Sequence, residues 1–213
     1  LSAGKDVLFT CLSSGISSTI NNAFVCKEEM QEKYPDAEIC VFDSICASGG
    51  HGLLIYHAIE NKKKGMSVKE NMQALEELKH RIVHKFTVDD LTYLQRGGRI
   101  SKTAAVIGGM IQLKPVLHVD TEGRLAAESK VRGRKKALNQ LLAEMDICTG
   151  SYADKQDVVL ICHADCPEDA EYVRAKVEEK YHPNKIIMSE VGPIVGAHVG
   201  PGTMVLIFEG DKR

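Results

Sequence analysis

The chain has 213 residues, and 44% of them are hydrophobic, which is enough for a sizeable core in one large domain or two small ones. Lys and Arg total 27 against 29 for Asp and Glu, a formal net charge of −2 without a long basic run, so no nucleic acid partner is expected. The longest apolar stretch, about residues 104–112, is well short of the roughly 20 residues of a membrane span, and the N-terminus lacks a signal pattern; we expect a soluble, cytoplasmic protein.

The first part of the chain alternates predicted strands and helices. Strands are predicted at residues 7–12 and 38–42, and helices at 17–30, 50–60 and 68–81. Ser67 with Glu70 three residues later forms a capping box that should begin the third helix. This alternation favours an α/β fold with a parallel sheet and helices on its faces.

The pattern changes after Val83. Strands are predicted at residues 85–88, 115–120, 124–131, 157–162, 185–191 and 204–209, and helices at 89–95, 134–145 and 167–181, with a further apolar helix through Ile107 and Ile111. Gly123 should supply the positive φ of a hairpin turn. We expect two α/β units in close contact, residues 1–83 and 84–213, with a cleft between them.

A cluster of hydroxyl residues follows the first predicted strand. Ser14, Ser17 and Thr19 lie where a strand ends and a helix begins, so their hydroxyls and the unpaired N–H groups of the helix suit a carboxylate or a phosphate. The same residues are also favoured as simple helix caps and turn residues, and the sequence leaves both interpretations open.

Three further segments carry groups suited to binding or catalysis. His198 is the one titratable side chain of the Gly- and Pro-rich loop predicted over residues 192–203. Two segments, at residues 96–101 and 132–136, place arginines beside glycines. Their guanidiniums could bind a phosphate or carboxylate, or could equally form a solvated basic surface, and the sequence leaves both interpretations open. Residues 162–166 hold Cys, His and Asp without zinc spacing, so no metal site is expected, and the seven scattered cysteines predict reduced thiols.

Taken in order, six blocks of this sequence closely resemble the DegV family, and the resemblance runs through essentially the whole chain. The blocks are Leu12–Thr19, Val41–Ser44, Phe86–Ser101, Lys114–Leu117, Lys130–Gly133 and Gly196–Gly202. The resemblance implies a two-domain α/β protein that encloses one long-chain fatty acid in a tunnel, with the carboxylate in a head-group cleft between the domains. It also implies a carrier that is not itself an enzyme and needs no cofactor. Such a carrier presents the carboxylate to a separate kinase subunit for acyl-phosphate formation, and the resemblance allows transient contact with a membrane.

The resemblance also assigns individual residues. Ser17 falls where the family has the serine that contacts the fatty-acid carboxylate, and His198 where it has the histidine near that head group. Arg132 or Arg134 falls near an arginine implicated in handling the phosphorylated head, and the choice between them stays open. Ser14 and Thr19 complete the predicted ligand-binding set.

Two departures from the family pattern accompany these assignments. Ser18 stands where the family usually has Gly after the carboxylate-binding serine, and the N-terminal segment with a Thr-Ser-Gln-Pro-type motif is not found, so we expect a shortened first domain. Two alternatives to a lipid carrier stay open: a hydrolase or transferase using Ser17 or Ser44 with His198, and a truncated interaction module that binds no lipid. Ser44 does not lie in a G-x-S-x-G elbow, and neither a Walker loop nor a G-x-G-x-x-G fingerprint is present.

Overall fold

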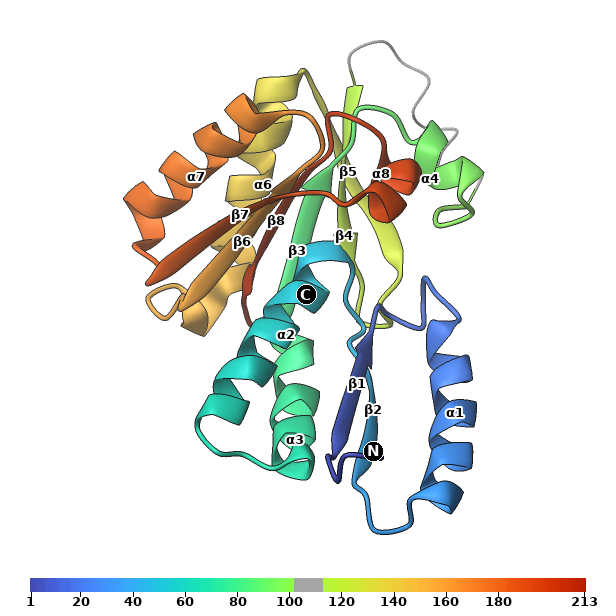
Figure 1. The fold of residues 1–213 in the computed structure, drawn as a ribbon. Helices are drawn as coiled ribbons and strands as arrows, with labels where there is room; N and C mark the ends of the chain where they lie inside the picture. The colour runs from blue at the N-terminus through green and yellow to red at the C-terminus, as the bar shows by residue number, and fades with distance from the viewer. Residues whose placement is uncertain (102–112) are drawn as a thin grey trace.

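The computed structural model describes residues 1–101 and 113–213. The helix predicted through Ile107 and Ile111 lies outside the described residues. The chain forms a smaller unit from its first part and a larger unit built on a broad sheet, and the two are packed against each other (Figure 1).

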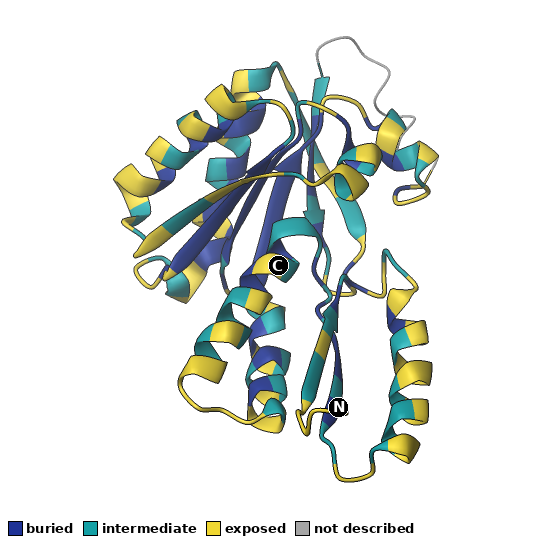
Figure 2. Cartoon of the chain, in the orientation of Figure 1, coloured by how far each residue is buried: buried dark blue, intermediate teal, exposed yellow. Residues whose placement is uncertain are grey.

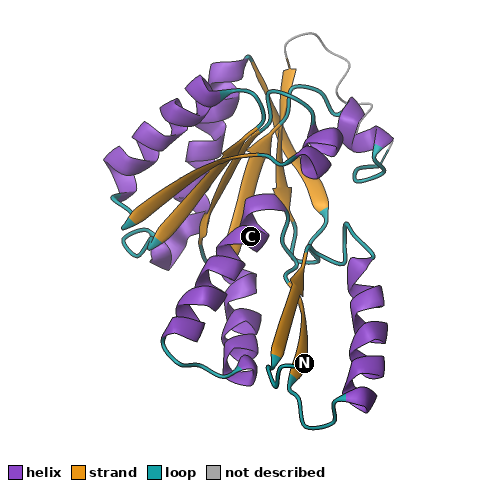
Figure 3. Cartoon of the chain, in the orientation of Figure 1, coloured by secondary structure: helices purple, strands orange, loops and turns teal. Residues whose placement is uncertain are grey.

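The smaller unit is a strand–helix repeat. Its elements are β1 (Val7–Cys11), α1 (Thr19–Lys33), β2 (Ile39–Asp43), α2 (Ser48–Lys63) and α3 (Val68–Leu78). β1 and β2 are parallel, with Val7 opposite Ile39, so the predicted parallel pairing is confirmed here. Helix α1 covers one face of the pair, while α2 and α3 lie on the other (Figure 3).

Helix α3 begins at the predicted capping box. The Oγ of Ser67 accepts a hydrogen bond from the Glu70 N–H at 3.3 Å, and the Ser67 N–H donates to the Glu70 carboxylate at 2.8 Å. The α-helix ends at Leu78, earlier than predicted, because the chain tightens into a 3₁₀ turn over Lys79–Arg81 before the next strand.

The larger unit is built on a mixed sheet. Its strands are β3 (Ile82–Thr87), β4 (Leu113–Val119), β5 (Leu125–Arg132), β6 (Val158–His163), β7 (Lys185–Glu190) and β8 (Met204–Glu209), in the order β5-β4-β3-β8-β6-β7. Among the described strands of this sheet, only β6 and β7 are parallel neighbours. Strand β8 inserts antiparallel between β3 and β6, and β4 and β5 form the predicted hairpin, with Gly123 at a φ of +75° in its turn.

Helices cover both faces of the large sheet. Helices α6 (Arg134–Thr149) and α7 (Pro167–Tyr181) lie on one face, and α7 has the predicted bounds, with Pro at its first position. The other face meets α2 of the smaller unit and, towards one end, the short helices α4 (Thr92–Arg96) and α8 (Pro193–Val199) (Figure 1). Helix α8 occupies a segment that was predicted to be a loop.

One hydrophobic core runs through both units. It joins Phe42 and Leu53 of the smaller unit to Phe86 and Ile207 of the large sheet. A second core fills the space between the other sheet face and helices α6 and α7. The central strands β3, β6 and β8 are almost entirely buried, whereas the edge strands β5 and β7 are partly exposed (Figure 2).

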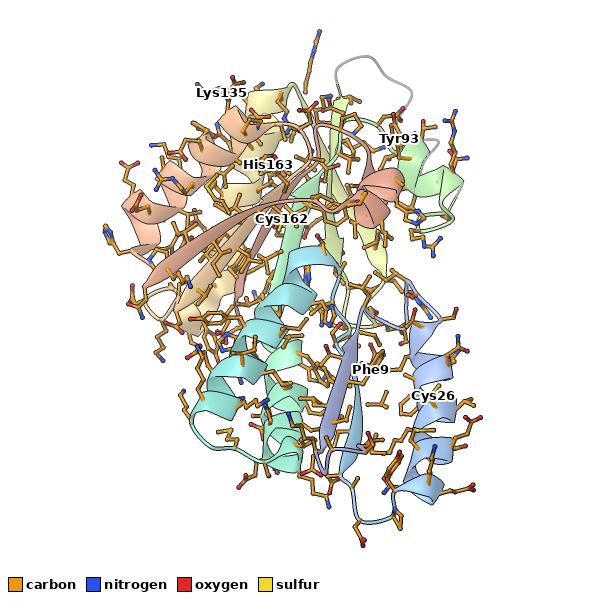
Figure 4. The ribbon with its side chains drawn as sticks, viewed as in Figure 1. Phe9, Cys26, Tyr93, Lys135, Cys162 and His163 are labelled. Carbon is orange, nitrogen blue, oxygen red and sulfur yellow. The ribbon has the colours of Figure 1, made fainter. Side chains whose placement is uncertain are left out.

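The start of α2 packs very closely on the large sheet. A Cβ at Gly49 would lie 2.6 Å from the Sγ of Cys162, and a Cβ at Gly50 would lie 1.9 Å from the Nε2 of His84. Cys162 lies on β6, near the centre of the molecule (Figure 4). Because these two glycines have no side chain, helix α2 of the smaller unit can lie directly against the large sheet.

Candidate functional site

The main pocket lies on the α2 and α8 face of the large sheet. It has a volume of about 150 Å³, a size at which apolar cavities hold hydrophobic molecules. Most of the residues that line it are apolar and come from both units: Leu12, Ile16, Ala47, Phe86, Leu94, Val119, Leu125, Val191, Ile194, Val195, Val199 and Val205. Polar side chains in the lining are Ser17, Ser48, His84, Arg99, His198 and Thr203.

Ser17 reaches this pocket from the turn between β1 and α1. Its N–H donates to the carbonyl oxygen of Ser13 at 3.0 Å, which fixes the backbone of the turn. Its Oγ lies 3.0 Å from the Oγ1 of Thr19, and Ser17 is only partly buried. A hydroxyl has one donor and two acceptor positions, so Ser17 keeps capacity for a ligand.

His198 lines the same pocket from the last turn of α8. A Cβ at Gly97 would lie 2.1 Å from the Nδ1 of His198, so the glycine loop after α4 lies directly against the imidazole. The sequence placed Ser17 and His198 in one site, and the structure brings both to one pocket although they come from different units.

Arg99 is a third polar residue of this group, and the predicted site did not include it. Its Nε donates to the carbonyl oxygen of Ile16 at 3.2 Å and its Nη1 donates to that of Gly97, so the guanidinium bridges the Ser17 turn and the glycine loop. No carboxylate of residues 1–101 or 113–213 forms an ion pair with it. The basic Gly-rich segment over residues 96–101 was the signal that could have found this residue.

The remaining polar lining residues interact with the protein itself. Thr203 donates to the carbonyls of Val199 and Gly200, at 3.1 and 2.9 Å. The Nε2 of His84 lies 3.2 Å from the carbonyl oxygen of Ala47, and burial lowers the pKa of His84 to about 3, so its ring is neutral at physiological pH. Positive charge available to an anionic ligand in this lining therefore comes from Arg99.

A second, more open pocket adjoins the first. The two share Ile16, Ser17, Arg99 and Leu125, and the second adds the start of α1, the glycine loop and the beginning of β5. Ser14 and Ser18 line this second pocket and are exposed. Thr19, the first residue of α1, lines neither pocket, although it contacts the Ser17 hydroxyl.

The two predicted arginines lie elsewhere. Arg132 is exposed at the end of β5 and lines neither of these pockets. Arg134 begins α6, where its Nε donates to Asp169 at 2.7 Å and its Nη1 lies 3.5 Å from Asp89. Arg134 lines a separate, more open pocket with these acids, so the structure does not bring either arginine to Ser17 and His198.

Within residues 1–101 and 113–213, neither Ser17 nor Ser44 is hydrogen-bonded to His198. Ser44 is fully buried and its Oγ accepts from the Cys46 N–H. Over the same residues, no cluster of three His, Cys, Asp or Glu could hold a metal ion. Nor does any described helix have the length and apolar character to cross a membrane.

The structure is that of an α/β protein with an apolar pocket whose polar lining residues include Ser17, Arg99 and His198. Residues 1–211 match the model of the DegV family, whose description calls its members uncharacterised, and the chain belongs to that family. It is 40% identical over 210 residues to a DegV domain-containing protein of Clostridium perfringens, covering 99% of this chain and 72% of that one.

Solved structures of DegV proteins have the same fold. A stearic acid-binding protein of Eubacterium ventriosum superposes with a TM-score of 0.85 at 26% identity, over 98% of this chain and 72% of that one. The fatty acid kinase B3 protein of Streptococcus pneumoniae, loaded with linoleic acid, superposes with a TM-score of 0.89 at 21% identity, over 97% and 72%. At 21% identity, the similarity to the Streptococcus pneumoniae protein shows a shared fold and no more.

Proposed function

We propose that this protein binds one long-chain fatty acid, with part of the hydrocarbon in the main pocket and the carboxylate beside its polar lining residues. The observation that carries the proposal is the pocket itself: an apolar lining with a hydroxyl, an imidazole and a guanidinium that forms no ion pair within residues 1–101 and 113–213. Each buried methylene of such a ligand contributes about 0.8 kcal/mol, and charge-assisted hydrogen bonds hold the head group.

The head group is assigned to Ser17, Arg99 and His198. Arg99 hydrogen-bonds the carbonyl of Ile16, the residue before Ser17, and the carbonyl of Gly97, which lies against His198. A carboxylate at this point would meet a hydroxyl donor and a fixed positive charge together. Ser14 and Thr19 are proposed to support it from the adjoining turn, and Arg132 and Arg134 to act outside the pocket.

The protein is further proposed to be a carrier that presents the carboxylate to a separate kinase subunit. Support comes from the similarity to a protein named for fatty acid kinase and from the two adjoining pockets, which leave Ser17 accessible from the surface. The chain also lacks the phosphate-cradling sequence motifs that a nucleotide site would need.

Mass spectrometry tests the proposal. Under native conditions the purified protein should carry one noncovalent ligand per chain, and after denaturation that ligand should be released with the mass of a fatty acid. Protein that carries no lipid and takes up none from added stearic acid would exclude a carrier. An acyl group retained on Ser17 after denaturation would instead support a serine-dependent enzyme.

A further inference from the structure

The tip of the β4–β5 hairpin contacts the turn that carries Ser17. A Cβ at Gly15 would lie 2.9 Å from the carbonyl oxygens of both Glu122 and Gly123. A Cβ at Gly123 would lie 2.0 Å from the Oγ of Ser13. Backbone of the larger unit therefore lies directly against backbone of the smaller unit, two to four residues before Ser17.

Ser13 connects this contact to Ser17. Ser13 is fully buried, its Oγ accepts from the Gly15 N–H at 3.0 Å, and its carbonyl oxygen accepts from the Ser17 N–H at 3.0 Å. A shift of Ser13 therefore moves the backbone that holds the Ser17 hydroxyl.

The hairpin tip is rigid enough to serve as a support. One carboxylate oxygen of Asp120 accepts from the Glu122 and Arg124 N–H groups, at 2.9 and 2.8 Å, and the Asp120 carbonyl accepts from the Gly123 N–H at 3.0 Å. Gly123 has a φ of +75°, which glycine adopts without steric cost. The next residues, Arg124 and Leu125, begin the wall of the pockets.

The loop after β2 meets the same tip. A Cβ at Gly123 would lie 3.0 Å from the Cα of Ile45, which has a φ of +45°, a conformation rare for a β-branched residue. The Asp43 carboxylate holds both loops, accepting from the Ser14 N–H at 3.1 Å and the Ile45 N–H at 3.0 Å. Strained backbone of this kind persists where its surroundings fix it.

We propose that the hairpin tip, at Gly123, is the element that positions the Ser17 hydroxyl for the ligand carboxylate. In this arrangement the hairpin of the larger unit controls the affinity for the ligand carboxylate, because it fixes the position of Ser17 in the smaller unit. This inference rests on the proposed function, because it takes Ser17 to bind the carboxylate. Gly123 is a positioning residue and does not itself touch the ligand.

The test compares stearic acid with octadecanol, which has the same chain length but lacks the carboxylate. Gly123→Ala and Gly15→Ala should each weaken stearic acid binding by about tenfold, the loss expected for a misplaced hydrogen bond to a charged group, and should change octadecanol binding by less than about twofold. Gly123 has a positive φ, which strains an alanine, whereas Gly15 does not. Gly15→Ala therefore introduces the steric clash with the hairpin tip without backbone strain. Gly65→Ala is the matched control, because Gly65 has a φ of +87° and no atom within 4 Å of a Cβ.

A double-mutant cycle with Ser17→Ala decides whether the hairpin acts through Ser17. In the Ser17→Ala background, Gly15→Ala should cost no further stearic acid affinity. An equal loss for acid and alcohol, or the same loss with and without the Ser17 hydroxyl, would overturn the inference while leaving fatty-acid binding intact. Failure of the unsubstituted protein to bind stearic acid would overturn the proposed function and the inference together.

Discussion

The ammonium of Lys85 donates hydrogen bonds to both carboxylate oxygens of Glu128, each at 2.8 Å. Lys85 is on β3, fully buried on the α6 side of the large sheet, opposite the pocket. Glu128 is the extra residue of a bulge, since Ser129 pairs with Val116 and Ala127 with Leu117. The bulge thus turns the Glu128 side chain towards the ammonium of Lys85. A β-bulge commonly redirects a side chain in this way.

Lys85→Met should destabilise the protein by about 3 kcal/mol, because it leaves Glu128 and the nearby Glu144 without their cation; Glu128 is partly exposed, which limits the cost. The double variant Lys85→Met, Glu128→Leu should recover part of the loss. Urea unfolding measures both. Stearic acid affinity should not change in either variant, and a parallel loss of affinity would show that the network supports the pocket.

Ser17→Ala should weaken fatty-acid binding by about one to two tenfold steps, since a hydrogen bond to a charged group contributes roughly 1.5–3 kcal/mol. Ser18→Ala is the neighbouring control, because Ser18 is exposed and its side chain does not cap α1. Displacement of a fluorescent fatty acid measures both affinities. Equal affinity of the Ser17 variant and the unsubstituted protein would remove Ser17 from the site.

Arg99→Gln should weaken stearic acid binding by about three- to tenfold and reduce its dependence on salt, because an exposed guanidinium attracts the carboxylate through a screened interaction. Arg96→Gln is the matched control, since Arg96 lies in the same segment but lines neither pocket. Titrations at low and high ionic strength give both quantities. Identical behaviour of the two variants would exclude Arg99 as a ligand.

His84 should contribute to the loss of stability in acid. Burial lowers its pKa from 6.5 to about 3, so below pH 6.5 the unfolded chain binds a proton that the folded protein does not. Its contribution is complete above pH 6.5 and decreases towards pH 3, with a slope of up to about 1.4 kcal/mol per pH unit. His84→Asn should remove about one proton from the uptake on unfolding near pH 5, measured from urea curves at several pH values; an unchanged uptake would contradict the assignment.

The purified chain with ATP, Mg²⁺ and a fatty acid should form no acyl-phosphate, because its sequence has no phosphate-cradling loop. Trapping with hydroxylamine would detect the product. Turnover in the absence of a second protein would show that the chain is itself an enzyme.

Local sequence signals predicted local structure well. Pro167 marks the start of α7, and Ser67 with Glu70 marks the start of α3, because caps act within a single turn of chain. Helix α8 was missed, since the glycines of residues 192–202 indicated a loop and only tertiary contacts, with α4 among them, hold seven residues in a helix. The order of the large sheet was not predictable either, because β3 pairs with β8, which is distant in the sequence.

The candidate site was predictable in part. Ser17 and His198 were chosen through the family resemblance, and both line one pocket. Arg99 could not be separated from Arg96, Arg132 and Arg134 by residue type, because the distinction depends on which guanidinium the fold brings to the pocket. Arg134 meets Asp89 and Asp169 only through the packing of β3 and α7 around it.

The position of β8 also has a consequence for synthesis on the ribosome. Among the described strands, β8 emerges last, yet it fills the place between β3 and β6, and His198 precedes it by only a few residues. Until β8 is in place, the edges of β3 and β6 that it joins are unpaired and the pocket lacks Val205 from its lining. The main pocket can therefore form only after β8 has been synthesised and has paired with both of its neighbours.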